Sequence, residues 1–452
     1  MKFRFLSLII FCFLACYNSN AQSLRYKIGQ MVWTGFTGTR LHDTIKSDLR
    51  NLNLGGVILF AGNISNPSQV KFLNDTIKML ASTPPFIAVD QEGGRVARLN
   101  RSNGFDTSYT AYKLGYIFNK EDSTRRMAAI MAGWLQQSGF NVNLAPVADV
   151  NVNPNSPAIG KLERSYSAVP ESVYYHTKWF ADEFNKKKIA VSLKHYPGHG
   201  SALQDSHLGF TDITNTWSSD ELIPYKRLVA DGFTDFVMTG HLYHAGIDSV
   251  YPASLSHKAA TQLLRDSIGF NGVVITDAMG MSAITQNYTF TEAVELAIRA
   301  GNDILLYTAT LSSNISLTRR VINIIEQAVL QGRITQSRID EAYERIIAMK
   351  QKYGLIAGAE DIARETAVTP VVYQNYPNPF RGQTEVSFYL PEEMHVTVTL
   401  YNVCGEIVNV PAYGIYRSGS HVVRVNGLAS GVYFLRLTAG SYSATRKLIS
   451  LH

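Results

Sequence analysis

The chain has 452 residues, about three times the ~150 residues of a typical domain, although a single barrel can be longer. Hydrophobic residues make up 46% and charged residues 17% of the chain, which excludes a disordered, collagen-like or coiled-coil protein. The 42 Lys and Arg residues form no basic run and exceed the 36 Asp and Glu residues only slightly, to a net charge of +6, so the charge does not indicate nucleic-acid binding.

Residues 1–21 have the pattern of a secretory signal peptide. Two basic residues, Lys2 and Arg4, precede an apolar run at 5–15, and small residues follow before the expected cleavage. This run is too short to cross a bilayer, which takes ~20 residues. The segment also resembles a lipoprotein cleavage box that would place a lipid on Cys16. No later apolar run is long enough for a membrane span, so we expect an exported protein that is either soluble or attached to the cell surface.

Residues 22–358 alternate short apolar runs with helical segments. The runs are rich in Val, Ile and Leu without strict alternation, as in parallel strands covered on both faces. They lie at 31–34, 54–60, 86–90, 142–146, 190–195, 236–239, 273–277 and 303–306. Eight strand–helix repeats predict an α/β fold of the (β/α)8 TIM-barrel type, with an open doubly wound sheet as the main alternative.

Helix start and stop signals stand between these runs. Asn66 followed by Pro67 is typical of a helix start, and Gly301 is typical of a helix end. The clearest signals predict helices at 68–80, 256–268 and 291–300.

The pattern changes near residue 370. We expect a linker at 359–372 and a second domain at 373–452. Its apolar and polar residues alternate in short runs between Gly, Pro and Asn turns, which predicts a small all-β sandwich. The runs lie at 385–390, 396–401, 421–425 and 432–437.

Four sequence motifs characterise this C-terminal domain. They are NYPNPF at 375–380, YNVCGE at 401–406, LASGVY at 428–433 and KLI at 447–449. Together they resemble the C-terminal sorting domain of the type IX secretion system of the Bacteroidota. The resemblance implies that the type IX machinery is a partner and that the protein is secreted or held at the outer-membrane surface. An unrelated carbohydrate-binding or immunoglobulin-like module is the alternative.

Polar residues follow several predicted strands of the barrel. Asp90, Lys194, His195 and Asp277 stand at strand ends, and His241 follows the sixth strand. In a barrel these strand ends meet at one face, where active sites form. A single strand-end carboxylate is as often a cap of the next helix, but several such strands favour a common site.

Five motifs surround these residues, in the order VDQEGGRVAR (89–98), NLAPVAD (143–149), KHYPGHG (194–200), DSH (205–207) and VITD (274–277). They resemble glycoside hydrolase family three, in its β-N-acetylglucosaminidase branch, and the resemblance spans Ile28 to Leu355. It implies an enzyme that releases terminal N-acetylglucosamine from chitin-derived or peptidoglycan-derived oligosaccharides, with no metal and no other cofactor.

Cleavage of a glycosidic bond needs a carboxylate at the anomeric carbon and a proton donor at the leaving oxygen, because the transition state resembles an oxocarbenium ion. Asp277 can be that carboxylate. The resemblance makes it a nucleophile that forms a covalent glycosyl-enzyme, and it makes His207 the acid/base, paired with Asp205. An imidazole with a pKa near ~6.5 can both donate and accept a proton near neutral pH.

The resemblance also assigns a sugar-binding set, whose charged members hydrogen-bond buried sugar hydroxyls. The set is Asp90, Arg98, Arg164, Lys194 and His195, with Met281 lining the pocket. Asp149 is expected to be structural. His195, His199 and His207 lack the helical spacing of a zinc pair, so we expect no metal site.

Two loops depart from the family pattern. Ser201 and Ala202 stand where the family has Asp and Thr, and Lys161 and Leu162 are inserted before Glu163, which leaves the placement of both loops open. Two other functions also stay open. A histidine acid/base does not repel phosphate as a carboxylate would, so the enzyme could be a phosphorylase. A catalytically inactive surface glycan-binding protein is the other alternative.

Overall fold

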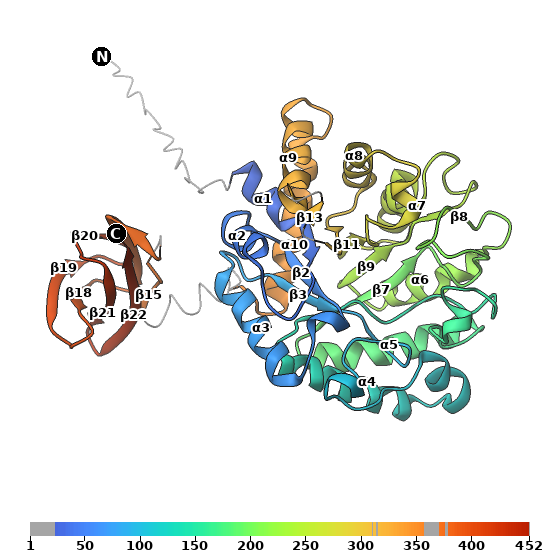
Figure 1. The fold of residues 1–452 in the computed structure, drawn as a ribbon, viewed down its shortest axis with the longest axis horizontal. Coiled ribbons are helices and arrows are strands. Elements are labelled where there is room, and N and C mark those ends of the chain that lie inside the picture. The colour runs from blue at the N-terminus through green and yellow to red at the C-terminus, as the bar shows by residue number, and fades with distance from the viewer. Residues whose placement is uncertain (1–22, 310, 313–314, 357–369, 376–377, 452) are drawn as a thin grey trace, which may run out of the picture. The chain divides into compact units, whose positions relative to one another are not determined.

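The computed structural model describes residues 23–309, 311–312, 315–356, 370–375 and 378–451. The chain divides into two compact units, the first ending at Ile356 and the second beginning at Ala357 (Figure 1). The predicted signal peptide, and the predicted linker up to residue 369, lie outside the described residues. Within the described ranges, no helix has both the length and the apolar character needed to cross a membrane.

The first unit is a (β/α)8 barrel with eight parallel strands, as the sequence predicts. Their order around the ring is β11-β9-β7-β6-β3-β2-β1-β12, and a parallel bridge between Ile275 and Ile304 joins the two ends. Each strand overlaps one predicted apolar run. The strands are β1 (Val32–Gly35), β2 (Gly56–Leu59), β3 (Phe86–Val89), β6 (Val142–Asn143), β7 (Ala190–Tyr196), β9 (Phe236–Thr239), β11 (Val273–Thr276) and β12 (Leu305–Leu306).

Helices cover the outside of the ring (Figure 1). In α3, Asn66 caps the first turn by accepting a hydrogen bond from the backbone N–H of Gln69, and α8 ends at Gly301, whose φ of 112° lies in the region that favours glycine. The segment predicted as a helix at 256–268 is π-helical over η7 (Lys258–Ser267). The long α-helices are α1 (Leu24–Gln30), α2 (Asp43–Asn51), α3 (Pro67–Leu80), α4 (Glu121–Ser138), α5 (Pro170–Lys186), α6 (Ile223–Ala230), α8 (Phe290–Ala300), α9 (Leu317–Leu330) and α10 (Gln336–Lys352).

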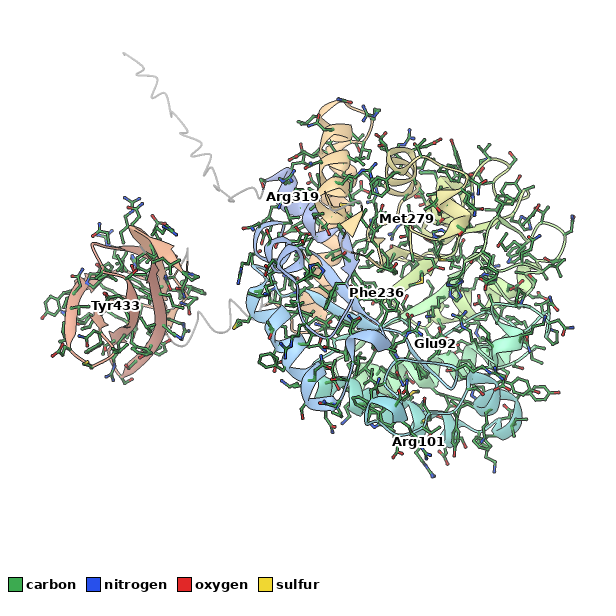
Figure 2. All side chains as sticks on the ribbon, in the orientation of Figure 1. Glu92, Arg101, Phe236, Met279, Arg319 and Tyr433 are labelled. Carbon is green, nitrogen blue, oxygen red and sulfur yellow. The ribbon has the colours of Figure 1, made fainter. Side chains whose placement is uncertain are left out.

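Aromatic rings fill the barrel near the start of its strands. Trp33, Phe86 and Phe236 are fully buried, and their ring centroids lie 5.3 to 5.6 Å apart in tilted and edge-on arrangements. Phe236 lies near the middle of the unit (Figure 2). Lys350 of α10 reaches this cluster: its ammonium lies 5.2 Å from the Phe86 ring centroid and donates to the side-chain oxygen of Gln30 at 2.5 Å.

Replacing Lys350 with Met should stabilise the protein by about 2 kcal/mol near pH 7. Burial lowers the pKa of Lys350 from 10.5 to about 7, so between these two values the unfolded chain binds more protons than the folded chain. Wild-type stability therefore rises with pH across this window. The gain from Lys350→Met should be largest at and below pH 7 and should shrink towards pH 10, which urea unfolding at pH 6, 7 and 9.5 measures. A gain that is the same at all three values would contradict a buried Lys350 whose pKa is lowered to about 7.

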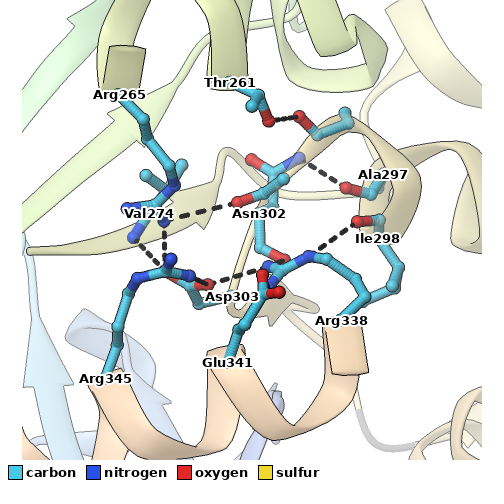
Figure 3. A network of polar contacts seen from close by, with 12 residues as sticks. Thr261, Arg265, Val274, Ala297, Ile298, Asn302, Asp303, Arg338, Glu341 and Arg345 are labelled. Atoms are coloured by element: carbon cyan, nitrogen blue, oxygen red, sulfur yellow. Dashed lines mark hydrogen bonds and ion pairs between the residues drawn. The ribbon is translucent and has the colours of Figure 1, made fainter. Parts of the chain in front are cut away.

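An ion cluster closes the same end of the barrel (Figure 3). Asp303, which precedes β12, is fully buried and contacts three guanidinium groups, those of Arg265 at 2.5 Å, Arg338 at 2.8 Å and Arg345 at 3.1 Å. It also accepts from the backbone N–H of Val274 at 3.0 Å. Burial raises the pKa of Asp303, but the three arginines outweigh burial and lower it. One carboxylate thus joins η7 and α10 to the start of β11.

The second unit is a small β-sandwich, as predicted. Its two sheets share one core that includes Phe388 and Val423 from the smaller sheet and Val398 and Leu435 from the larger. The smaller sheet has β15 (Val371–Val372), β17 (Gln383–Leu390) and β20 (Gly419–Asn426). The larger has β16 (Phe380–Arg381), β22 (Tyr442–Leu451), β21 (Gly431–Ala439), β18 (Met394–Tyr401) and β19 (Ile407–Tyr416). The four predicted runs correspond to β17, β18, β20 and β21.

Candidate active site

A cavity of about 620 Å³ opens where the barrel strands end. Its wall takes residues from the ends of β2, β3, β7, β11 and β12 and from the loops that follow them. Of the predicted site residues, Asp205 alone does not line it. The others do: Asp90, Arg98, Arg164, Lys194, His195, His207, Asp277 and Met281. The fold therefore brings together side chains that are far apart in the sequence.

Asp277 directly follows β11, so the strand fixes its backbone. Its N–H donates to the carbonyl of Thr239 at 2.9 Å, and its carboxylate accepts from the N–H of Ala278 at 2.7 Å. Burial raises the pKa of Asp277, but His195, His241 and His207 outweigh burial, and the pKa falls to about 2. The side chain is therefore a carboxylate throughout the neutral range and is available as a nucleophile.

His207 stands in the loop between β7 and α6. Its Nδ1 lies 2.7 Å from Oδ1 of Asp205, and its backbone N–H donates to the same oxygen at 3.0 Å. The side chain of His207 is 58% exposed, and the pairing through Nδ1 leaves Nε2 available to a ligand. Asp205 contacts the Nδ1 side of the His207 ring and does not itself line the cavity.

Buried polar groups anchor this loop. Asp149 accepts hydrogen bonds from the backbone N–H groups of His195 at 3.0 Å and His199 at 2.8 Å, which agrees with its predicted structural role. The ring of His199 in turn meets the Ser206 hydroxyl at 3.1 Å. Burial lowers the pKa of His199 to about 4, so this ring is neutral. Ser206, the residue just before His207, is thus held by His199, whose backbone is in turn hydrogen-bonded to Asp149.

Charged side chains in the cavity wall are paired with one another. The ammonium of Lys194 lies 2.8 Å from Asp90 and 2.7 Å from Glu92, and Arg164 makes two 2.8 Å hydrogen bonds to Glu92. Arg98 lies 3.3 Å from Asp90. Burial raises the pKa values of Asp90 and Glu92, but the neighbouring lysine and arginines outweigh burial and lower both values. Rigid, paired charges of this kind suit hydrogen bonding to sugar hydroxyls.

Glu92 is a site residue that the sequence reasoning missed (Figure 2). It lies on the short strand β4 (Gln91–Gly93), lines the cavity and holds both Lys194 and Arg164. The signal that could have found it is its place in the motif at 89–98, two residues after Asp90. A carboxylate beside two glycines has few side-chain neighbours along the chain and therefore needs partners from elsewhere in the fold.

His195 has a defined orientation in this network. Its Nδ1 lies 2.8 Å from Asp149 and its Nε2 lies 3.3 Å from Arg164. Because the Asp149 carboxylate is an acceptor, Nδ1 carries a proton and donates it to Asp149. Across the described part of the chain, no group of three or more His, Cys, Asp or Glu residues is arranged to hold a metal ion. The arrangement offers a carboxylate, an imidazole and fixed charges around one cavity.

Comparison with known proteins gives consistent matches for both units. Residues 23–349 match the glycosyl hydrolase family 3 N-terminal domain, and residues 374–450 match the secretion system C-terminal sorting domain. Beta-hexosaminidase A of Pseudoalteromonas piscicida is 30% identical over 74% of this chain, which spans only 59% of that relative. Beta-hexosaminidase LpqI of Mycobacterium tuberculosis is 31% identical over 73% of this chain and 83% of the relative.

Solved structures agree with the sequence relatives. A family 3 β-N-acetylglucosaminidase from Paenibacillus sp. has a TM-score of 0.70 and 30% identity, covering 79% of this chain and 71% of that chain. The structure of Mycobacterium tuberculosis LpqI has a TM-score of 0.64 and 29% identity, covering 73% of this chain and 94% of that chain.

Proposed function

The chain belongs to glycosyl hydrolase family 3, and we propose that it is a retaining exo-β-N-acetylglucosaminidase. Its substrates are chitin-derived or peptidoglycan-derived oligosaccharides with a terminal N-acetylglucosamine. The observation that supports this best is that Asp277 and His207 line one cavity together with a paired set of charged residues. The sorting-domain match supports export through the type IX machinery, after removal of residues 1–21 as a signal peptide.

The reaction follows from these side chains in two steps. In the first, the Asp277 carboxylate attacks the anomeric carbon while His207 gives its proton to the departing oxygen, so a covalent glycosyl-aspartate forms and the leaving group departs as an alcohol. In the second, His207 accepts a proton from water, and the resulting oxygen nucleophile displaces Asp277. Asp205 holds the His207 ring in place through its contact with Nδ1 at 2.7 Å. Two inversions at one carbon give net retention.

The terminal sugar occupies the part of the cavity formed by the charged network. We assign its contacts to Asp90, Arg98, Arg164, Lys194, His195 and Met281. Glu92 acts through Arg164 and Lys194, because it holds both cations in position.

His207→Ala should lower kcat/KM for chitobiose by about 10³-fold, within the range typical for loss of a general acid. With a 2,4-dinitrophenyl leaving group the glycosylation step should fall far less, because a good leaving group departs without a proton. Stopped-flow release of the aglycone measures this step separately from hydrolysis of the glycosyl-enzyme. Equal losses in the first step for both substrates would contradict the role of His207 as proton donor.

A glycoside phosphorylase is the second candidate, favoured by the neutral character of an imidazole acid/base where many glycosidases have a carboxylate. In that reaction phosphate, instead of water, displaces Asp277 and leaves with the sugar. The products distinguish hydrolysis from phosphorolysis. If the protein is a hydrolase, as proposed, the wild-type enzyme should give free N-acetylglucosamine both with and without inorganic phosphate. Formation of the sugar 1-phosphate as the main product would replace hydrolysis by phosphorolysis.

A further inference from the structure

Two apolar side chains follow His207 in its loop and lie exposed on the surface. Leu208 is 78% exposed and Phe210 is 46% exposed. A single exposed leucine is ordinary in a soluble protein. Here, however, the two side chains stand one and three residues after the proposed proton donor, so the same loop carries all three.

The backbone that carries these side chains is ordered by a second loop. Directly after Phe210, the short strand β8 (Thr211–Asp212) pairs in parallel with β10 (Leu242–Tyr243) from the loop after β9. The Phe210 ring lies 5.3 Å from the Tyr243 ring, and the Tyr243 hydroxyl donates to the carbonyl of Ser249 at 3.1 Å. We call Leu208, Phe210 and Tyr243 the apolar ledge.

The ledge follows a residue of the cavity wall along the chain. Among the described residues of this loop, His207 lines the cavity, whereas the members of the ledge do not. The terminal sugar occupies the part of the cavity formed by the charged network, and His207, which also lines the cavity, must reach the oxygen that joins this sugar to the rest of the substrate. With the sugar placed in this way, the atoms beyond that oxygen lie on the His207 side of the sugar, where the chain continues to Leu208 and Phe210.

We propose that the apolar ledge binds the leaving-group sugar of the substrate. A pyranose ring presents a face of C–H groups, and such a face packs against an aromatic ring or a leucine side chain with the loss of hydrated apolar surface from both. The inference rests on the proposed function, because it takes His207 as the proton donor. It assigns selectivity for longer, sugar-bearing substrates to Leu208 and Phe210.

Two substrates with the same terminal sugar test this assignment. Chitotriose has a leaving group that can reach the ledge, whereas β-N-acetylglucosaminyl fluoride releases a single fluoride ion that cannot cover it. Leu208→Ser and Phe210→Ala should each lower kcat/KM for chitotriose about 10-fold, the size expected for loss of an apolar contact. Both should leave kcat/KM for the fluoride within about twofold of wild type, with an unchanged pH profile.

Leu330→Ser is the matched control, because Leu330 is 68% exposed at the last residue of α9, and it should leave both substrates unaffected. Equal losses on both substrates, or no loss on either, would overturn the assignment of the ledge. Light scattering that shows a wild-type dimer and a Leu208→Ser monomer would also overturn it, by making the ledge a self-association surface. If wild type cleaves neither substrate, the proposed function itself fails.

Discussion

Asp277→Ala should lower kcat for aryl N-acetylglucosaminides by at least about 10³-fold while leaving the fold intact, because it removes the nucleophile from the reaction. Asp277 follows β11 and lines the cavity, where its charged neighbours are histidines, so its loss breaks no salt bridge to a lysine or arginine among the described residues. Initial-rate assays combined with circular dichroism of both proteins measure the two effects separately. A variant that keeps one tenth of wild-type activity would rule out Asp277 as the nucleophile.

Sodium azide provides a sharper test of the same residue. In Asp277→Ala the removed carboxylate leaves space for a small anion, so azide can attack the anomeric carbon from that side while His207 protonates the leaving oxygen. The product should be the α-glycosyl azide, of inverted configuration, and its formation should restore part of the rate. Met281→Ala, which also changes the cavity wall but keeps Asp277, should give no α-glycosyl azide. If wild type and Asp277→Ala are equally inert yet bind chitooligosaccharides, the protein is a glycan-binding protein.

Asp303→Ala should destabilise the barrel by about 3–5 kcal/mol, the cost typical of breaking a buried ion pair by removal of one partner. The substitution leaves Arg265, Arg338 and Arg345 close together without their shared carboxylate, and it removes the acceptor of the Val274 N–H. Because this cluster lies at the opposite end of the barrel from the cavity, folded Asp303→Ala should keep its kcat.

Urea unfolding of wild type and variant measures this loss. Asp303→Asn retains an acceptor oxygen but not the charge and should be intermediate. Asp43→Ala is the control: the Asp43 side chain is fully exposed and pairs with Lys46 in the same helix, so its midpoint should match that of wild type. A loss for Asp303→Ala as small as that for Asp43→Ala would mean that the three arginines are stabilised by solvent instead.

The strands, and the polar residues that directly follow them, can be predicted from the sequence because both depend on local patterns. Buried parallel strands need uninterrupted Val, Ile and Leu, and such runs end at Val89 and Thr276, directly before Asp90 and Asp277. The helix boundary at Gly301 is equally local, because a positive φ at a helix end favours glycine.

Other features depend on contacts between distant segments and have no local signal. Lys350 looks like a surface lysine until α10 places it against Phe86. Strand β19 escapes prediction because most of its residues are exposed and it contains Pro411 and Gly414, which are typical of turns. The pairing of Glu92 with Arg164 joins positions 72 residues apart, and no spacing rule covers it.

The paired charges of the cavity also determine how a substrate is captured. Leaving the histidines aside, three cations and three carboxylates line the described cavity wall: Arg98, Arg164 and Lys194, with Asp90, Glu92 and Asp277. These six charges of the cavity wall therefore balance and exert little long-range attraction on an uncharged sugar. An uncharged sugar arrives by diffusion alone, with an association rate that ionic strength scarcely alters. Under the proposed function, discrimination among uncharged glycans therefore begins at contact and depends on hydroxyl geometry and loop shape.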